Sequence, residues 1–400
     1  MNDLHDTAIA DLLFAKPSPH RRGDYDELVE ELHAVARRVQ AQDAGAEPAL
    51  RRLMLALSEH SDPRCVGLYV FAAGMARRLA GEVVEQANLY LTRFEMPQIH
   101  LFNLLGRAVP FVGLATQLAN QALMDGIAGQ SRPTVIDVGI GTGRQIGVLL
   151  ESLASAGRLP RLLTVVGIEP SAWALNEARQ HIEQTAQRLG AEVSFVGIEA
   201  SAETLGAGDW QRIREACTSR PVVNASFALH HIADQEGGGD QRDKVLRHLR
   251  ALNPALLVLA EPDVDHLERG FYRRFSNCMA HFGAVFRTLD QLPLDQADRD
   301  ALKVGFFGRE IADILGSPEA LRSERHESAA QWLRRLDSAG FEPGVEAAVP
   351  AAPAGPVRIG RHQGHLSIDA VDEPVVAIFT ARPRPLLRVR GARTAELASA

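Results

Sequence analysis

An aspartate and three glycines lie in the segment DVGIGTG, between a short apolar run and an amphipathic helix: Asp137, Gly139, Gly141 and Gly143. Glycine adopts positive φ angles at little cost, and its missing side chain lets a ligand approach the backbone. The N-terminus of the following helix would add N–H groups and a partial positive charge, which suit a carboxylate, a ribose or a phosphate. We therefore expect these four residues to bind a cofactor. The alternative is that the glycines only let the helix pack close to the strand.

The glycine spacing bears on which cofactor this is. The dinucleotide fingerprint is G-x-G-x-x-G, with the third glycine opening the helix. Here the spacing is G-x-G-x-G with an acid two positions earlier, which disfavours an NAD enzyme. A second acid, Glu169, ends the next apolar run. A carboxylate in that place can accept hydrogen bonds from both ribose hydroxyls, and capping the helix that follows is an equal alternative.

The pattern along the chain places these residues in a sheet. Between residues 134 and 265, five apolar runs alternate with helical stretches. Such alternation predicts βαβ crossovers and a parallel sheet, and runs that are apolar on both faces suit burial between helices. We expect an α/β fold: a doubly wound, mostly parallel Rossmann sheet with an α-helical cap.

Helical patterns flank the alternating region on both sides. Apolar residues recur at three- and four-residue steps in the first 127 residues, and the residues after 265 are mainly helical and rich in aromatics. Two strand-like runs near the end predict a closing hairpin. The expected organisation is a disordered N-terminus (1–23), an N-terminal helical cap (24–127), a Rossmann cofactor-binding core (128–265), a helical cap insertion (266–320), a C-terminal helix with the closing β-hairpin (321–386) and a flexible tail (387–400).

Composition excludes several classes of function. The 400 residues carry a formal net charge of −7, which gives no electrostatic reason to bind nucleic acid or an anionic membrane. The three cysteines lack C-x-x-C spacing, and this fits a reducing compartment. The first residues are acidic and are not a signal peptide, and no apolar run is long enough to span a membrane. We expect a cytoplasmic protein with no nucleic-acid or membrane partner; the oligomeric state stays open, a homodimer included.

The strand ends resemble the motifs of class I S-adenosylmethionine-dependent methyltransferases. In that family an acid precedes a G-x-G-x-G loop by two residues, as Asp137 does here. The resemblance implies that Glu199 and Ala200, at the end of the third strand, contact an adenine ring. It also implies that Asn224, in the segment NASFALHH, lines the same site. The cofactor implied is S-adenosyl-L-methionine, held in a methyltransferase-like Rossmann core.

Segments outside this core resemble the GRAS proteins, plant growth regulators with bacterial relatives. ANQALMDG (residues 119–126) is similar to the helix before the VHIID motif of that family, and TVIDV (134–138) stands where VHIID belongs. Residues 268–275 resemble the PFYRE region, and 325–341 resemble the start of the SAW region, although the SAW tripeptide itself is absent. The match covers roughly residues 80–385. Plant VHIID motifs have lost most of their glycines, whereas this chain keeps three, which favours cofactor binding here. The resemblance implies a bacterial GRAS protein.

His230 and Glu261 are the residues we expect to be catalytic. Methyl transfer needs an in-line approach and sometimes a base, and these residues end the fourth and fifth strands. Histidine titrates near neutral pH, and a carboxylate can orient an acceptor. The alternative is that Glu261 simply ends a strand. We expect no metal site, because the pair His230–His231 has no third ligand at suitable spacing.

Two functions follow from these patterns. The first is S-adenosylmethionine-dependent methyl transfer to a small-molecule substrate enclosed between core and cap. The second is a non-catalytic GRAS-like regulator that binds a small ligand or another protein. The intact glycine loop favours the first, and the full-length GRAS resemblance favours the second.

Overall fold

The computed structural model describes residues 25–81, 98–232, 240–344 and 355–385. The expected disordered N-terminus (1–23) and flexible tail (387–400) lie outside the described residues. The described part of the first third is helical: α2 (Tyr25–Gln40), α3 (Ala46–Ser58), α4 (Cys65–Ala80), α5 (Gln98–Ala108) and α6 (Pro110–Gly126).

Strands and helices then alternate as the sequence pattern predicts. The elements are β1 (Thr134–Val138), α7 (Arg144–Ser155), β2 (Leu162–Ile168), α8 (Ala172–Leu189), β3 (Glu192–Ile198), η1 (Ala202–Thr204), α9 (Ala207–Ala216), β4 (Val222–Ser226), η2 (Leu229–His231), α10 (Gln241–Ala251) and β5 (Leu256–Pro262). All five residues of β1 are buried, because helices cover both faces of the sheet at this point.

The last third combines helices with antiparallel strands. Its elements are α11 (Phe271–Gln291), α12 (Gln296–Asp300), the π-helical η3 (Ala301–Phe307), α13 (Gly308–Gly316), η4 (Glu319–Leu321), α14 (Ala329–Ser338), β6 (Phe341–Gly344), β7 (Val357–His362), β8 (His365–Ala370) and β9 (Glu373–Pro383). They complete a nine-stranded sheet of order β3-β2-β1-β4-β5-β9-β8-β7, with β6 paired to β9.

The expected mostly parallel sheet is only partly correct. The strands β3, β2, β1, β4 and β5 are parallel, and β6 to β9 are antiparallel. The expected closing hairpin is present as β8–β9, but the prediction missed a further strand. The first strand-like run is itself the hairpin β7–β8, turning at Gly364 with a φ of 90°, and β9 lies between β5 and β8. A glycine inside an apparently continuous strand pattern marks this turn.

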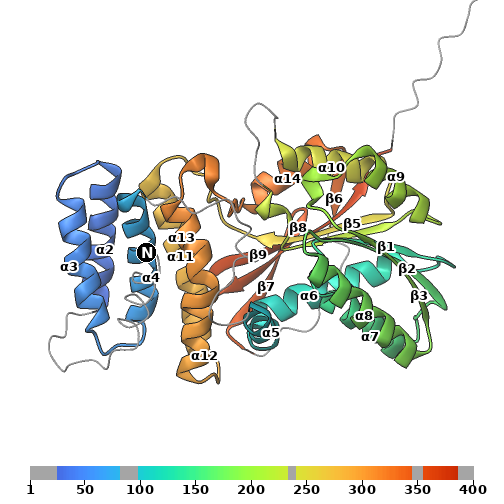
Figure 1. Ribbon diagram of the computed structural model, residues 1–400, viewed down its shortest axis with the longest axis horizontal. Coiled ribbons are helices and arrows are strands. Elements are labelled where there is room, and N and C mark those ends of the chain that lie inside the picture. The colour runs from blue at the N-terminus through green and yellow to red at the C-terminus, as the bar shows by residue number, and fades with distance from the viewer. Residues whose placement is uncertain (1–24, 82–97, 233–239, 345–354, 386–400) are drawn as a thin grey trace, which may run out of the picture.

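The helices form two groups (Figure 1). At one end of the molecule α2, α3 and α4 gather with α11 and α13, and at the other end helices cover the sheet. The pair α4–α13 is tightly packed because it meets at glycines. A Cβ on Gly74 would lie 3.2 Å from the Cβ of Leu315, and one on Gly316 would lie 3.2 Å from the carbonyl oxygen of Gly74. No described helix is long and apolar enough to cross a bilayer.

The face of the sheet that α9, α10 and α14 cover has a hydrophobic core of its own, called here the second core. Trp332 of α14 is the largest fully buried side chain in this core. A buried ion network fixes α14 beside α10: Glu327 pairs with Arg242 at 2.5 Å and with Arg335 at 2.7 Å. The helix begins with a capping box between Ser328 and Gln331, which stabilises its first turn.

Removal of the Trp332 side chain should destabilise the fold. Trp332→Ala leaves a large cavity in the second core, and we expect a loss of about 3–5 kcal/mol in the free energy of unfolding. Trp173→Ala is the matched control, since Trp173 is 57% exposed on α8 and should change stability by no more than about 0.5 kcal/mol. Urea denaturation followed by circular dichroism measures both. Equal losses in the two variants would contradict this account of the core.

Candidate functional site

The glycine loop joins β1 to α7 in the expected place. Gly139, Gly141 and Gly143 have φ angles of 73°, 52° and 75°. A Cβ on Gly139 would lie 2.7 Å from the Cβ of Ala228, and one on Gly143 would lie 3.0 Å from the Cα of Ala178. Only at Gly141 would a Cβ meet nothing within 4 Å. Two of the three glycines therefore serve close packing, and the space beside Gly141 is the part of the loop that a ligand can approach.

Glu169 lies against this loop and is bonded within the protein. Its Oε2 accepts the N–H of Gly141 at 3.1 Å, and its Oε1 accepts the N–H of Ser171 at 3.0 Å. Ser171 is the N-cap of α8. Burial raises the pKa of Glu169, and the two N–H donors oppose the rise. The cap of α8 is the Ser171 hydroxyl, which accepts the N–H of Ala174, and the carboxylate of Glu169 joins the glycine loop to this N-cap residue.

Asp137 and Asn224 face each other across neighbouring strands. The two are partners in the parallel register of β1 and β4, and Asn224 Nδ2 donates to Asp137 Oδ1 at 2.7 Å. Asn224 Oδ1 accepts from Gln145 Nε2 at 3.3 Å and from Ser226 Oγ at 3.0 Å. Gln145 is bonded in turn to Asn120 of α6. Sequence reasoning missed Gln145 and Asn120, although Asn120 lies in the ANQAL segment.

Burial governs the charge of this network. Asp137 is only 3% exposed. Desolvation raises the pKa of its carboxyl to about 7, against the opposing effect of the Asn224 hydrogen bond. The carboxyl is therefore only partly ionised near neutral pH.

Glu199 and Ala200 follow the end of β3, next to the end of β2. The N–H of Glu169 donates to the carbonyl of Ile198, which holds these two strand ends together. Glu199 is exposed and Ala200 is half-buried. The carboxyl ends of β1 to β4 therefore lie at one edge, as the pattern predicts, and they bring Asp137, Glu169 and Asn224 to the glycine loop.

His230 and Glu261 are paired but do not face an open cleft as expected. The two side chains are 4% and 0% exposed. Glu261 Oε2 lies 2.5 Å from His230 Nδ1, and Glu261 Oε1 accepts the N–H groups of Leu229 and Ala228. Burial raises the pKa of Glu261 to about 7 and lowers that of His230 well below its usual value. The turn η2 at the end of β4 folds onto the end of β5, and this covers both residues.

Two further residues that the search for catalytic groups missed lie beside this pair. Glu324 and His326 belong to the segment between η4 and α14, and both are buried against His230. His326 is part of the Arg325-His326-Glu327 segment that resembles the GRAS family. Their distance from His230 along the chain is too large for spacing to reveal the contact.

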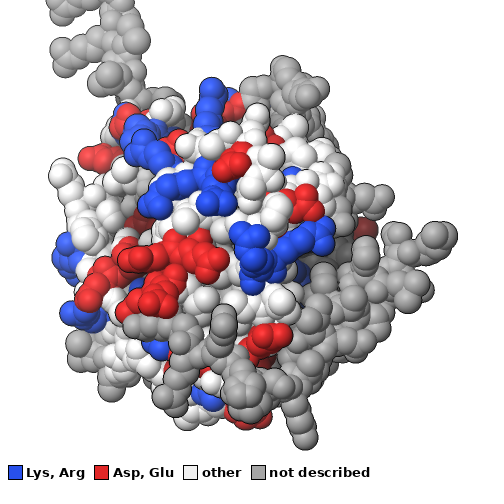
Figure 2. All heavy atoms as spheres, turned by 90° about the vertical axis from the view of Figure 1, so that its left-hand side faces the viewer, with Lys and Arg blue, Asp and Glu red and all other residues white. Residues whose placement is uncertain are grey.

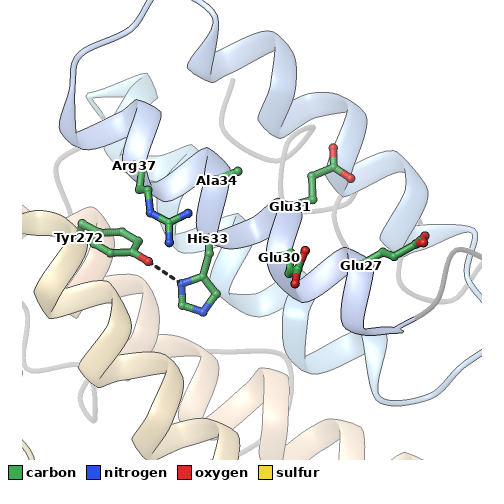
Figure 3. A pocket seen from close by; sticks show the side chains of 7 residues that line it. All are labelled: Glu27, Glu30, Glu31, His33, Ala34, Arg37 and Tyr272. Atoms are coloured by element: carbon green, nitrogen blue, oxygen red, sulfur yellow. Dashed lines mark hydrogen bonds between the residues drawn. The ribbon is translucent and has the colours of Figure 1, made fainter.

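A surface hollow lies at the helical end of the molecule, between α2 and the start of α11 (Figure 3). It is lined by Glu27, Glu30, Glu31, His33, Ala34, Arg37 and Tyr272. The Tyr272 hydroxyl lies 3.2 Å from His33 Nδ1, and the Arg37 guanidinium lies over the Tyr272 ring at 4.7 Å. Figure 2 shows acidic side chains gathered beside basic ones on this end of the molecule. Carboxylates and a cation–π pair thus mark the outer face of the helical end.

Replacing Asp137 should change how stability depends on pH. An acid whose pKa is raised by folding contributes stability in full below its unfolded pKa, near 3.8, and that stability is lost as pH rises through about 7. Asp137→Asn removes this loss. The difference in unfolding free energy between variant and wild type should grow from pH 4 to pH 7, by up to about 1.4 kcal/mol per pH unit. Urea denaturation at several pH values tests this; parallel curves would contradict it.

Comparisons with known proteins agree with this fold. The family model described as the GRAS domain family matches residues 28–350. DELLA protein RGL3 of Arabidopsis thaliana is 30% identical over 79% of this chain and 60% of its own length. The structure of SCL7 from Oryza sativa aligns with a TM-score of 0.73 at 22% identity, covering 89% of this chain and 99% of that one. The plantazolicin methyltransferase BpumL in complex with SAH reaches a TM-score of only 0.38 at 10% identity, too distant to bear on activity.

The chain spans 56–60% of the length of the first curated relatives it matches, which are plant proteins. These relatives support the family. The expected bacterial source stays a prediction. The family model covers well over half of the chain, and a relative 30% identical matches 79% of it. The chain belongs to the GRAS domain family.

Proposed function

We propose that this chain is a non-catalytic regulator of the GRAS type that acts by binding another protein. One observation carries the proposal: the groups expected to hold a cofactor or perform catalysis are bonded to one another inside the fold. Glu169 accepts two backbone N–H groups, Asp137 is bonded to Asn224, and Glu261 is bonded to His230.

Energetics support this interpretation. Buried carboxylates need partners, and once those partners are internal the groups already stabilise the fold without a ligand. A catalytic base must reach its substrate within hydrogen-bond distance. His230 and Glu261 are buried and paired, so they suit structural support better than proton transfer.

The family relationship supports the same conclusion. GRAS proteins are identified with growth regulation, and the relatives named here carry regulator names such as DELLA. A fold of this class can retain its strand order and glycine turn after cofactor chemistry is lost. Which protein this chain binds, and whether the complete protein carries further segments, belong to the proposal.

The second candidate function is S-adenosylmethionine-dependent methyl transfer to a small molecule. It is favoured by the open space beside Gly141 and by the meeting of the strand ends at that loop. In this alternative Asp137 and Glu169 would each accept additional hydrogen bonds from the cofactor.

Isothermal titration calorimetry distinguishes the two functions. Neither S-adenosylmethionine nor S-adenosylhomocysteine should produce binding heat with the full chain at concentrations up to about 1 mM, the range in which weak ligands bind. Binding to either compound, lost in Gly141→Ala, would support the enzyme and refute the regulator.

In the native host, the same partner proteins should copurify with wild type and with Gly141→Ala, because the loop would not take part in partner binding.

Replacing Glu169 tests whether its carboxylate stabilises the fold by itself. Glu169→Gln leaves one carbonyl oxygen where two oxygens accept N–H groups, so stability should fall by about 1–2 kcal/mol. Glu199→Gln is the matched control at the end of the adjacent strand, and its exposed side chain should change stability by no more than about 0.5 kcal/mol. Thermal denaturation in the absence of ligand measures both. Equal stability of the two variants would argue against an internal role for Glu169.

A further inference from the structure

Three buried side chains from two distant parts of the chain meet beside the end of β4. Nitrogens of His230 and His326 and a carboxylate oxygen of Glu324 all lie within 4.8 Å of one another. Glu324 Oε2 is 3.7 Å from Nε2 of His230 and 3.3 Å from Nε2 of His326. The three residues are 4%, 0% and 1% exposed in the order His230, His326, Glu324.

The backbone holds this arrangement in place. The N–H of Arg325 donates to the carbonyl of His230, and the N–H of His266 donates to the carbonyl of His326, both at 3.1 Å. Asp313 Oδ2 accepts the N–H of Glu324 at 2.7 Å. Contacts from η2, from the segment after β5 and from α13 therefore fix the segment that carries Glu324 and His326.

Each imidazole uses its Nδ1 away from the cluster. Nδ1 of His230 lies 2.5 Å from Glu261 Oε2, and Nδ1 of His326 lies 3.0 Å from Nδ1 of His266. A ring nitrogen bonded on one side sets the tautomer of the other. The proposal takes Nδ1 of His230 as the donor to Glu261 and Nδ1 of His326 as the donor to His266; in that tautomer the Nε2 lone pairs of both rings point toward the carboxylate of Glu324.

In that tautomer Glu324 Oε2 and the two Nε2 atoms are all acceptors, while His231 pairs with the other carboxylate oxygen, Glu324 Oε1, at 3.3 Å. Within the described part of the chain, Glu324 Oε2 and His326 Nε2 have no hydrogen-bond partner, although the two atoms are 3.3 Å apart. Buried polar atoms without partners are rare and costly, and three converging lone pairs repel one another. A cation bound between them would remove both costs.

We propose that His230, Glu324 and His326 bind one divalent transition-metal ion, with Zn²⁺ as the best match. Zinc takes imidazole nitrogen and carboxylate oxygen at about 2.0–2.2 Å, so ligand atoms around a tetrahedral ion lie about 3.4 Å apart. The observed separations of 3.3 and 3.7 Å correspond to that spacing. Two imidazoles and one carboxylate suit zinc or iron(II) and not the hard ions Mg²⁺ and Ca²⁺.

The surroundings supply the outer contacts that metal-bound histidines use. Glu261 orients His230 and His266 orients His326, as carboxylates and other acceptors orient ligating imidazoles in known sites. Burial lowers the pKa of His230 well below its usual value and that of His326 to about 4. Burial by itself would raise the pKa of Glu324, but the pairing with His231, which contributes most of the opposing effect, holds it well below its usual value.

The ion would join two parts of the chain that are far apart in sequence. It would fasten the segment before α14 to η2 and so to the ends of β4 and β5. His231 is the member of the region nearest to solvent, with a side chain 27% exposed and its Nδ1 3.3 Å from Glu324 Oε1. The metal is a stabilising link in this proposal, which does not depend on the proposed regulatory function.

Metal analysis of the full chain tests the proposal. Protein refolded with Zn²⁺ and then desalted should retain one zinc per chain by plasma mass spectrometry. Protein refolded with Co²⁺ should show the visible absorption bands of a tetrahedral nitrogen and oxygen site. His326→Gln and Glu324→Gln should bind Zn²⁺ at least about 100-fold more weakly, and Glu261→Gln about 10- to 100-fold more weakly. The rise in Tm on adding Zn²⁺ should disappear in the first two variants.

His281→Gln is the matched control. His281 is also a buried histidine, and its ring lies 6.2 Å from that of His326, but it is outside the three-ligand set. This variant should keep its zinc. A wild-type chain without bound zinc and without cobalt bands would overturn the proposal, and a proton would then hold the cluster together. Zinc retained by both His326→Gln and Glu324→Gln would overturn it as well. The cobalt spectrum of the wild type decides the question even if a ligand variant does not fold.

Discussion

Carboxylates buried at the carboxyl edge of the sheet need partners within the protein, and the local structure is organised around meeting that need. Asp137 is bonded to an asparagine on the neighbouring strand, and Glu169 to backbone N–H groups of two loops. Glu261 is bonded to a histidine and to the turn that follows β4. Glu169 and Glu261 thereby tie the connections after their strands to neighbouring loops, and Asp137 ties β1 to β4.

The same requirement explains why the C-terminal part of the chain returns to this edge. Glu327 neutralises Arg242 and Arg335, two cations that α10 and α14 bring beneath the sheet. The residues just before it lie across the ends of β4 and β5 through backbone hydrogen bonds. The segment from Glu324 to Glu327 is therefore both a lid over His230 and an anchor for α14. Losing Glu327 would remove the 2.5 Å ion pair of the fully buried Arg242, and such a loss is strongly destabilising.

Close backbone approach is the second constraint. Gly139 and Gly143 let the loop after β1 pack against the residues that follow β4 and against α8. Gly74 and Gly316 do the same for two helices of the helical end. Glycine motifs of this kind are usually attributed to ligand binding, but at all four of these positions a backbone atom or a Cβ of the protein takes the space of the missing side chain. Packing accounts for most of the glycine motif, and Gly141 is the exception.

The sequence by itself determined the order of strands and helices, the glycine turn, the meeting of Asp137, Glu169 and Asn224, and the family. Local periodicity fixes the helices and strands, and the parallel βαβ rule brings the carboxyl ends of successive strands to one edge even where their residues are far apart in the chain. The tertiary structure decided the rest. A glycine turn split one strand-like run into the hairpin β7–β8, and pairing of β9 with β5 made half of the sheet antiparallel. It also buried His230 and Glu261 and brought Glu324 and His326 to them from almost a hundred residues away. Contacts between residues so distant in the chain leave no periodic signal in the sequence, so only the folded structure could show them.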